Sequence, residues 1–474
     1  MTTPYEALRR LQPVTGWTND TVAGVTFTGG LDPVVPTPFK VGVAGAATIA
    51  AAGLAAAQLW EQRTGRKQRV AVDVRQATAS MRSGTYMKLG DGALSHARNS
   101  IMGTYPTKDG RWSYLHCNFP NHRAAALKVL GVTEEDRAAV AKAVSGWNAL
   151  DLEEAIIANK GAGGMVRSFE EWKTHPQAAA IASLPLLEIE KIGDAPVEPL
   201  PPGSNGGDRP LSGIRVVDIT RVLAGPTCAR TLAEHGADVM KITAAHLPNL
   251  GYQEWDTGHG KLSAQLDLRD PAQLETLRGL ISQADVFSQG YRPGTLGSRG
   301  LSPEELAKLR PGLVYVSLSA FGHKGPWASR RGFDTVVQTV SGITLRQGAL
   351  FPGKEPGPQF YPLSAIDYCT GYLMAMGAML ALARRAQEGG SWLVRISLAQ
   401  VGKWLVDLGE VPESGLMGIP AEFSPQEIES WSMVTETPKG PLKHLKPAVQ
   451  LSETPARWAR PSVPLGYHQP VWPS

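Results

Sequence analysis

The feature that most constrains the fold is a regular alternation of β-branched runs and amphipathic stretches within residues 211–322. GIRVVDIT, ADVMKIT, DVFSQGY and GLVYVSLSAFG have the composition of strands, and TCARTLAEHG, DPAQLETLRGLISQA and SPEELAKLR have helical periodicity. Strands that alternate with helices at this spacing form βαβ units, in which helices cover both faces of a parallel sheet. The sequence therefore predicts an α/β fold.

Ligands of such sheets bind at the carboxyl ends of the strands. The loops RVLAGP, SQGYRPG and SAFGHKGPW follow strands and are predicted to lie on this rim. No Gly-x-Gly-x-x-Gly pattern follows the first strand, which argues against a dinucleotide site. Lys241 and Lys261 could meet phosphates, although each taken singly also fits a solvated surface lysine.

Composition narrows the class of protein. With 42% apolar and 19% charged residues, the 474-residue chain is globular. A net charge of +4, spread along the chain, weakly favours an anionic small ligand and does not favour nucleic acid. Cys117, Cys228 and Cys369 lack paired spacing, so we expect no disulfide framework, no metal site and a cytoplasmic location.

Residues 41–60 carry no charge, and a run of about 20 apolar residues can span a bilayer. Most of these residues are Ala and Gly, which gain little on transfer into lipid. We therefore expect a buried helix of a soluble protein and no membrane partner. The opening MTTPYEALRRLQPVTGW has no apolar core after a basic segment, so no secretory signal is expected.

Composition also divides the chain. Residues 1–34 are predicted to be an N-terminal extension, and residues 108–193 a small α+β domain. The proline- and glycine-rich residues 194–210 are predicted to be a linker. Residues 211–405 hold the predicted catalytic domain, and residues 406–474, rich in proline and poor in periodicity, an extended C-terminal tail.

A single acid, Asp367, precedes a long run of small and apolar residues in FYPLSAIDYCTGYLMAMGAMLALARR. One interpretation is a helix cap, because an Asp at a helix start accepts backbone N–H bonds and is favoured by the helix dipole. The other is a carboxylate that attacks an acyl donor and forms a covalent intermediate. The motif alone does not decide between them.

Residues 35–107 contain the same sequence of features, namely a proline-rich entry, a small-residue helix, a basic turn and an alternating strand. Superposing Val70 on Val394 shifts the numbering by 324, and the same shift places Asp367 on Val43. This indicates an internal repeat whose first copy lacks the acid. A cap required by the architecture would be expected in both copies, so the difference favours a chemical role.

Two further patterns bear on the site. RRGFDTVVQTVSG places two arginines before an apolar helix; Arg331 fits a solvated helix start, or it could bind an anion bidentately. No Gly-x-Ser-x-Gly elbow occurs, so the sequence gives no support to a hydrolase triad.

Together these segments resemble the class III CoA-transferase family (CaiB/BaiF type), which includes formyl-CoA transferases and α-methylacyl-CoA racemases. LSGIRVVDITRVLAGPTCARTLAEHGADVMKI, KLSAQLDLRDP, GFDTVVQTVSG and DYCTGYLMAMGAMLALARR follow in the family's order. RTGRKQRVAVDVRQA, DGRWSYLHCNF and VRSFEEWKTHPQ resemble the family's other half, but precede these segments. The resemblance implies a Rossmann-like large domain, a smaller α+β domain, permuted or fused halves and an interlocked homodimer.

The resemblance also implies a reaction. Asp367 matches the nucleophile that attacks an acyl-CoA thioester, forms an aspartyl-CoA thioester and passes CoA to a carboxylic acid. Leu223, Ala224 and Arg331 match positions that contact CoA, and Tyr291 matches an aromatic position near the nucleotide. Coenzyme A and acyl-CoA would be substrates, with no permanently bound cofactor.

The chain departs from the family in three places. Lys241-Ile242 leads into TAAH instead of Glu and often Arg, which would alter the nucleotide end of the CoA site. The glycine-rich closing loop has only two weak candidates, KGAGG (160–164) and GSNGG (203–207), which also fit linkers. Where the racemases have a proton-transferring His, Phe333 stands here. Because Phe333 cannot transfer a proton, a transferase is preferred over a racemase. The altered TAAH segment slightly favours a non-enzymatic relative, but the retained Asp367 argues against it.

Overall fold

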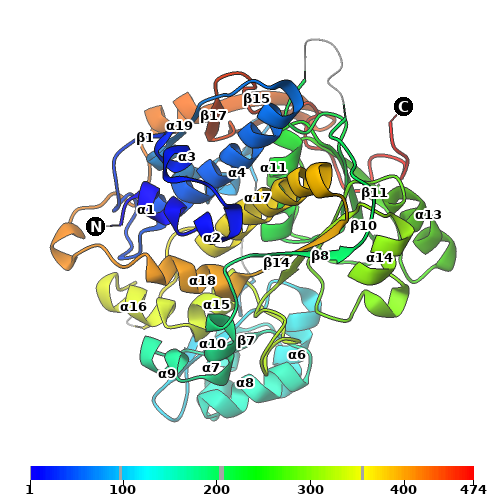
Figure 1. The fold of residues 1–474 in the computed structure, drawn as a ribbon. Coiled ribbons are helices and arrows are strands. Elements are labelled where there is room, and N and C mark those ends of the chain that lie inside the picture. Colours follow the sequence, from blue (N-terminus) through cyan, green and yellow to red (C-terminus); the bar gives the residue numbers. More distant parts are fainter. Residues whose placement is uncertain (1, 95–98, 202–207, 354–356, 474) are drawn as a thin grey trace.

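The computed structural model describes residues 2–94, 99–201, 208–353 and 357–473 (Figure 1). Its largest sheet has seven strands in the order β11-β10-β9-β12-β13-β14-β8. Six are parallel, and β8 pairs antiparallel with β14. The predicted parallel sheet is confirmed, and the strand order reverses between β9 and β12, as in doubly wound folds. The bounds are β8 (Glu188–Gly193), β9 (Arg215–Asp218), β10 (Asp238–Thr243), β11 (Lys261–Gln265), β12 (Val286–Gln289), β13 (Val314–Ser319) and β14 (Ser391–Ser397).

Helices cover both faces of this sheet (Figure 1). Successive residues of a strand point to opposite faces. Val216 accordingly packs into one hydrophobic cluster and Val217 into the other. Burial on both faces explains why the strands are almost continuously apolar. One cluster includes residues of α11 (Ala224–Glu234) and α17 (Ala365–Glu388), and the other includes residues of α13 (Pro271–Ile281) and α14 (Pro303–Leu309).

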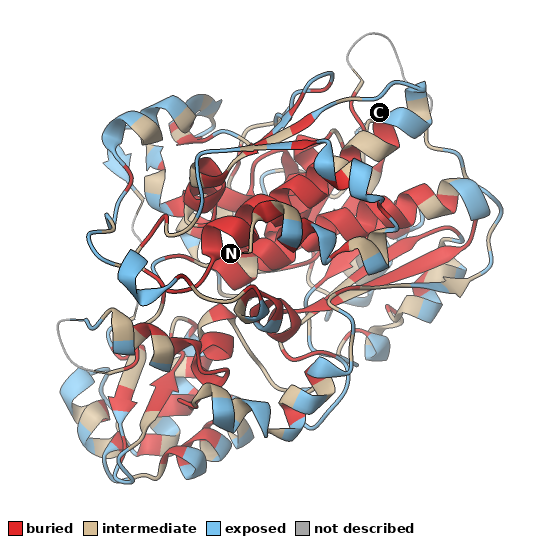
Figure 2. Ribbon diagram, turned by 60° about the vertical axis from the view of Figure 1, so that its left-hand side comes forward, coloured by how far each residue is buried: buried red, intermediate tan, exposed pale blue. Residues whose placement is uncertain are grey.

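Two long helices, α4 (Val41–Thr64) and α17, pack against each other in the core. Both are long and apolar enough to cross a membrane, but 89% and 94% of their most apolar windows are buried inside the protein. Figure 2 shows the buried residues concentrated along the central helices and the sheet. Both are therefore helices of the protein core, as was predicted for residues 41–60.

The segment that begins with α4 is built like the segment that begins with α17. Both helices have 24 residues, and their first residues differ by 324. A strand follows each helix, and a helix follows each strand directly: β2 (Val70–Asp73) leads into α5 (Val74–Ser80), and β14 leads into α18 (Leu398–Asp407). The first residues of α5 and α18 differ by the same 324. The helix–strand–helix unit thus occurs twice in the described residues, once with Val43 and once with Asp367 as the third helical residue.

The small domain contains a three-stranded sheet, in the order β5-β6-β7. It begins before the predicted boundary at residue 108, because β5 (Gly103–Pro106) pairs with β6 (Trp112–Leu115). The predicted range 108–193 also includes all of β8, which belongs to the large sheet. Next to β7 (Gly163–Met165) lies α8 (Ala149–Ala158), which contacts α6 (Pro120–Leu130), and α7 (Arg137–Val144) contacts α6 and β5.

Residues 406–474 contain more regular structure than the predicted extended tail. They include α19 (Pro425–Trp431), β15 (Ser432–Thr437), β16 (Gly440–Leu445) and β17 (Val449–Leu451). Strand β16 pairs with β3 (Lys88–Leu89), and β17 pairs with β2. Strand β17 was not visible as a pattern because its partner lies in the N-terminal part of the chain, whereas β15 and β16 form a local hairpin that was not predicted. Strand β2 also pairs with β1 (Val25–Thr28), which lies within the predicted N-terminal extension.

Candidate active site

A cavity of about 460 Å³ opens at the carboxyl ends of β9, β12 and β13. This is the point where the strand order reverses, the usual position of a ligand in a doubly wound sheet. The five residues that the family resemblance implicates all line this cavity: Leu223, Ala224, Tyr291, Arg331 and Asp367. The predicted rim loops thus meet around a single space.

Asp367 is the third residue of α17 and is half-buried at the cavity wall. The residue at the cap position is Ser364, and its side chain makes no capping hydrogen bond. Within the described part of the chain, the Asp367 carboxylate makes no hydrogen bond or ion pair, so it does not act as a helix cap. It is left facing the cavity.

A second carboxylate supports Asp367 from behind. Asp334 is the buried first residue of α15 (Asp334–Val340). Its Oδ2 accepts the backbone N–H of Asp367 at 3.0 Å, and its Oδ1 accepts the side-chain amide of Gln338. Burial, and then the negative charge of Asp334, raise the pKa of Asp367 well above that of an ordinary carboxylic acid.

The first copy of the repeat has the same kind of support. There the carboxylate of Asp32 accepts the backbone N–H groups of Gly42 and Val43, at 2.9 and 2.7 Å. Each long helix therefore begins on a carboxylate supplied by a separate segment. Since this support is present in both copies, the extra carboxylate at Asp367 is not needed to start the helix.

The turn after β9 is held in place by a buried ion pair. Lys261 donates from Nζ to Asp218 at 3.0 Å and to the Pro226 carbonyl at 2.9 Å. Within the turn, Val222 adopts a left-handed φ of 74°, an unfavourable conformation for a β-branched residue, and it lines the cavity. A Cβ added at Gly225 would lie 2.3 Å from Cβ of Thr220, so a glycine is required for this close turn.

The prediction that Lys241 and Lys261 are phosphate-binding or solvated lysines is wrong. Both are buried; Lys261 pairs with Asp218, and Lys241 pairs with Glu254. Burial lowers the pKa of Lys241 to about 7. A single lysine in a strand gave no local signal that it would be buried.

Positive charge reaches the cavity through arginines instead. Arg331 makes no hydrogen bond or ion pair to the residues that the structure describes, and burial and nearby Arg292 lower its pKa. Arg221 stacks over Phe119 at 5.8 Å and donates to the Pro248 carbonyl. Arg221, Arg292 and Arg331 all line the cavity, which therefore suits an anionic ligand.

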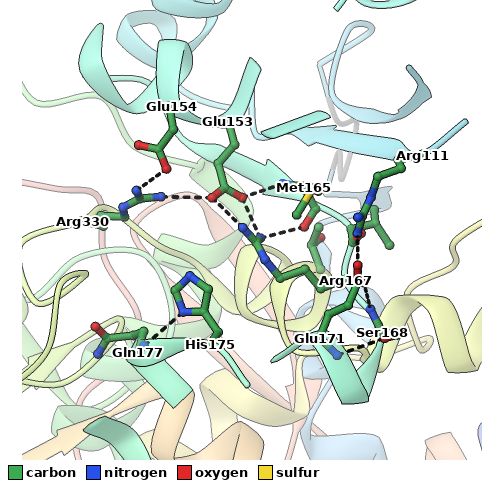
Figure 3. Close-up of polar contacts among 12 residues, drawn as sticks. Arg111, Glu153, Glu154, Met165, Arg167, Ser168, Glu171, His175, Gln177 and Arg330 are labelled. Atoms are coloured by element: carbon green, nitrogen blue, oxygen red, sulfur yellow. Dashed lines mark hydrogen bonds and ion pairs between the residues drawn. The ribbon is translucent and has the colours of Figure 1, made fainter. Parts of the chain in front are cut away.

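Arg330, the neighbour of Arg331, has a different role. Its guanidinium donates to Glu153 at 3.2 Å and to Glu154 at 2.6 Å, both on α8 of the small domain (Figure 3). It also lies over Trp327 at 4.3 Å. These contacts connect the 327–333 loop to the small domain. Of the two neighbouring arginines, only Arg331 has no ion pair with the described residues.

The altered TAAH segment lines a neighbouring cavity of about 150 Å³, which shares Leu247, Tyr291 and Thr295 with the larger one. Thr243, Ala244 and His246 lie on its wall, and so do Arg269 and Arg299 from other loops. Arg269 is paired with Asp267 on the same wall, so among these residues Arg299 is the guanidinium without a described ion pair.

Of the two candidate closing loops, KGAGG is excluded. Gly163 and Gly164 are buried residues of β7, paired with β6. A Cβ at Gly163 would lie 2.3 Å from the carbonyl oxygen of Tyr114, so this glycine permits close strand pairing. The other candidate, GSNGG (203–207), lies outside the described residues.

Sequence reasoning missed part of the site. Phe119 and His122 come from the start of α6 in the small domain and line the cavity opposite the sheet. Their only sequence signal was a strand followed directly by a proline-started helix in LHCNFPNH. The motif RRGFDTVVQTVSG contains Asp334, but its sequence gives no signal for the role of this residue, because the contact with Asp367 is made between separate helices.

Comparison with known proteins places the chain in one family. The model of CoA-transferase family III matches residues 11–197 and 211–409. Acetyl-coenzyme A transferase nodX of Hypoxylon pulicicidum is 31% identical over 328 residues, which is 65% of this chain and 55% of that protein. The alpha subunit of succinyl-CoA–L-malate CoA-transferase from Chloroflexus aurantiacus is 32% identical over 234 residues, 46% of this chain and 53% of that protein.

A solved CaiB/BaiF family protein from Brucella suis is 30% identical, covers 42% of this chain and 56% of its own, and has a TM-score of 0.38. The chain spans about half the length of the curated relatives it matches. The family model nevertheless covers most of the sequence, in two long segments. The chain belongs to CoA-transferase family III.

Proposed function

We propose that this protein moves CoA between an acyl-CoA thioester and a carboxylic acid, with Asp367 as the covalent nucleophile. The observation that carries the proposal is the Asp367 carboxylate, which makes no hydrogen bond to the described residues and opens on a cavity lined by arginines. Family membership supports the same reaction. The proposal includes a cytoplasmic homodimer without a permanently bound cofactor, supported by the sequence resemblance.

The reaction proceeds by exchange at two carbonyl groups. The ionised Asp367 attacks the thioester carbonyl, the C–S bond breaks, and a mixed anhydride and a CoA thiolate form. The thiolate attacks the aspartyl carbonyl, which releases the first acid and leaves an aspartyl-CoA thioester. The second carboxylate attacks this thioester, which breaks its C–S bond, expels the CoA thiolate and forms a second mixed anhydride. The thiolate then attacks the acyl carbonyl of the second acid, which gives the new acyl-CoA and restores the Asp367 carboxylate.

The surrounding residues have distinct tasks in this scheme. The N-terminal end of α17 favours negative charge on Asp367 and on the oxyanion that forms beside it. Arg221, Arg292 and Arg331 would hold the phosphates of CoA. Asp334 raises the pKa of Asp367, which increases the basicity of the attacking oxygen but reduces its ionised fraction at low pH.

A covalent-labelling experiment tests the proposal. The protein is incubated with a panel of acyl-CoAs, and an acyl or CoA adduct on the Asp367 peptide is sought by mass spectrometry, with release by hydroxylamine. An adduct together with transfer of CoA to a free acid is the expected result. Deuterium uptake at the α-carbon without CoA exchange would indicate a racemase. Absence of both reactions and of CoA binding would indicate a structural relative.

Asp334→Asn is expected to shift the pH dependence of acylation to lower pH. The reaction needs ionised Asp367, so its rate rises as pH passes through the pKa of that residue. Removal of the neighbouring negative charge lowers this pKa, so half-maximal acylation should move to lower pH. Single-turnover acylation rates across pH measure the shift. An unchanged or upward-shifted profile would contradict the coupling between the two acids.

Arg331→Ala is expected to weaken CoA binding by roughly ten- to a hundredfold, because a hydrogen bond to a charged group contributes about 1.5–3 kcal/mol. Calorimetric titration with CoA measures the change in dissociation constant. Arg69→Ala is the matched control, since Arg69 is exposed and does not line the cavity. Equal affinities of the two variants would show that Arg331 does not contact CoA.

A further inference from the structure

We propose that Tyr368 is a positioning residue for the nucleophile: its hydroxyl, held by the buried carboxylate of Asp256, fixes the direction in which the neighbouring Asp367 faces the cavity. The inference rests on the proposed function, because it concerns the geometry of the same attack. It begins from a second carboxylate contact at the start of α17, made one residue after the backbone contact to Asp334.

The Tyr368 hydroxyl belongs to a buried polar cluster. The residue is 3% exposed, and its hydroxyl donates to Oδ2 of Asp256 at 2.9 Å. The hydroxyl of Ser83, at the start of the short helix η1 (Ser83–Tyr86), donates to the same oxygen at 2.9 Å and lies 2.9 Å from the Tyr368 hydroxyl. A hydrogen bond to an ionised acceptor is about twice as strong as one between neutral groups, so the ring of Tyr368 is firmly held.

The carboxylate of Asp256 is itself held from two sides. Its Oδ1 forms an ion pair with Arg230 of α11 at 3.1 Å, and the backbone carbonyl of the same residue accepts that guanidinium at 3.2 Å. Asp256 lies on α12 (Gly251–Thr257), and Glu254 of this helix pairs with Lys241 of β10. The carboxylate is therefore fixed both to the large sheet and to a neighbouring helix.

Contacts at two successive residues set the rotation of the first turn of α17. Successive side chains of an α-helix point about 100° apart around its axis. Asp334 accepts the backbone N–H of Asp367, and a hydrogen bond along the helix axis restrains rotation about that axis only weakly. The contact to Asp256 is made through a side chain that points away from the axis, so it restrains the rotation directly. The direction of the Asp367 side chain is fixed as a consequence.

The internal repeat supports a link between the two residues. The shift of 324 places Tyr368 on Ala44, next to Val43. The first copy therefore keeps a carboxylate that accepts the N–H groups of the helix start, Asp32, but has neither the nucleophile nor the tyrosine. A tyrosine needed only to start or to pack the helix would be expected in both copies. Its presence only beside Asp367 favours a role in the chemistry.

The reaction depends on the direction of the carboxylate. The attacking oxygen must lie about 3–3.5 Å from the thioester carbonyl with its orbitals aligned, and a displacement of about 1 Å can lower the rate by about 10²-fold. Among the described residues, the carboxylate of Asp367 makes no hydrogen bond that would hold it at the cavity wall. Its direction is therefore set by the backbone that carries it, and Tyr368 restrains that backbone.

Tyr368→Phe removes the hydroxyl and keeps the ring. At saturating acyl-CoA, we expect single-turnover acylation of Asp367 to fall by roughly ten- to a hundredfold, while the dissociation constant for CoA stays unchanged. Tyr372→Phe is the matched control, because Tyr372 lies one turn further along α17, is also buried and makes no hydrogen bond through its hydroxyl to the described residues. Acylation by Tyr368→Phe at the starting rate, or an equal loss in Tyr372→Phe, would overturn the proposal.

The pH dependence of acylation separates positioning from a change in charge. Burial and the negative charge of Asp334 raise the pKa of Asp367, and Tyr368→Phe removes neither of them. We therefore expect the rate of this variant to fall by the same factor at every pH, with the midpoint of the profile unchanged. A shifted midpoint with an unchanged maximal rate would show that Tyr368 acts on the charge of Asp367, and the positioning role would be wrong.

The positioning role can also be tested without the reaction. If the starting protein forms no adduct with any acyl-CoA, the proposed function fails, and crystal structures of Tyr368→Phe and Tyr372→Phe decide the remaining question. An Asp367 carboxylate that is turned, or spread over several rotamers, in Tyr368→Phe alone supports the positioning role. The same arrangement of Asp367 in both variants overturns it.

Discussion

Replacing Asp367 by asparagine is expected to reduce CoA transfer by at least about 10³-fold, the scale of loss when a covalent nucleophile is removed. The amide has nearly the size of the carboxylate but cannot attack a thioester. The acyl adduct on the residue-367 peptide should disappear from the mass spectrum. CoA should still bind, because this substitution leaves the arginines of the cavity in place.

Glu388→Gln is the control for this experiment. It removes a carboxylate from the exposed end of the same helix, α17, and should leave transfer unchanged. The melting temperatures of both variants establish that the fold is intact. Transfer by Asp367→Asn within tenfold of the starting protein would show that another group attacks the thioester.

Glu153→Ala is expected to have the largest effect on stability. Glu153 accepts two hydrogen bonds from Arg167, at 2.7 and 2.9 Å, and one from the Met165 backbone at 2.7 Å (Figure 3). The side chains of Glu153 and Arg167 are only 1% and 4% exposed. Loss of one partner leaves the other charge buried and unpaired, which lowers the free energy of unfolding by about 3–5 kcal/mol.

Denaturant unfolding of the variant measures this loss, and Glu154→Ala is the matched comparison. Glu154 is the next residue on α8 and also pairs with Arg330, but its side chain is 55% exposed. An exposed ion pair contributes about 0–1 kcal/mol, so this variant should lose little stability. Similar losses in the two variants would show that burial does not set the strength of the Glu153 contacts.

The parts of the fold that could be predicted from sequence are those with a local cause. Apolar β-branched runs and amphipathic stretches alternate within residues 211–322, so the parallel sheet followed from neighbouring residues. The position of Leu223, Ala224 and Tyr291 at the rim followed in turn. The loops that contain them come after strands, and the carboxyl ends of parallel strands lie at the same edge of a sheet. The equal lengths of α4 and α17 were visible as a repeated pattern.

What could not be predicted depends on contacts between distant segments. The hydrogen bond from Asp367 to Asp334 and the approach of His122 to Phe333 arise from packing, for which the sequence carries no periodic signal. The burial of Lys261 depends on Asp218, which lies two strands away in the sheet. Strand β17 was missed for the same reason, since β2, with which it pairs, lies near the other end of the chain.

The ion pairs between α8 and Arg330 have a mechanical consequence. Arg330 precedes Arg331 in the chain, and Phe333 follows shortly after. Any movement of the small domain would therefore be passed through Arg330 to these two cavity residues. A tilt of the small domain that admits substrate would at the same time move Arg331 and Phe333 away from the cavity. Entry of the thioester and the return of Arg331 to its anion-binding position would then occur together, because the two ion pairs of Arg330 connect them.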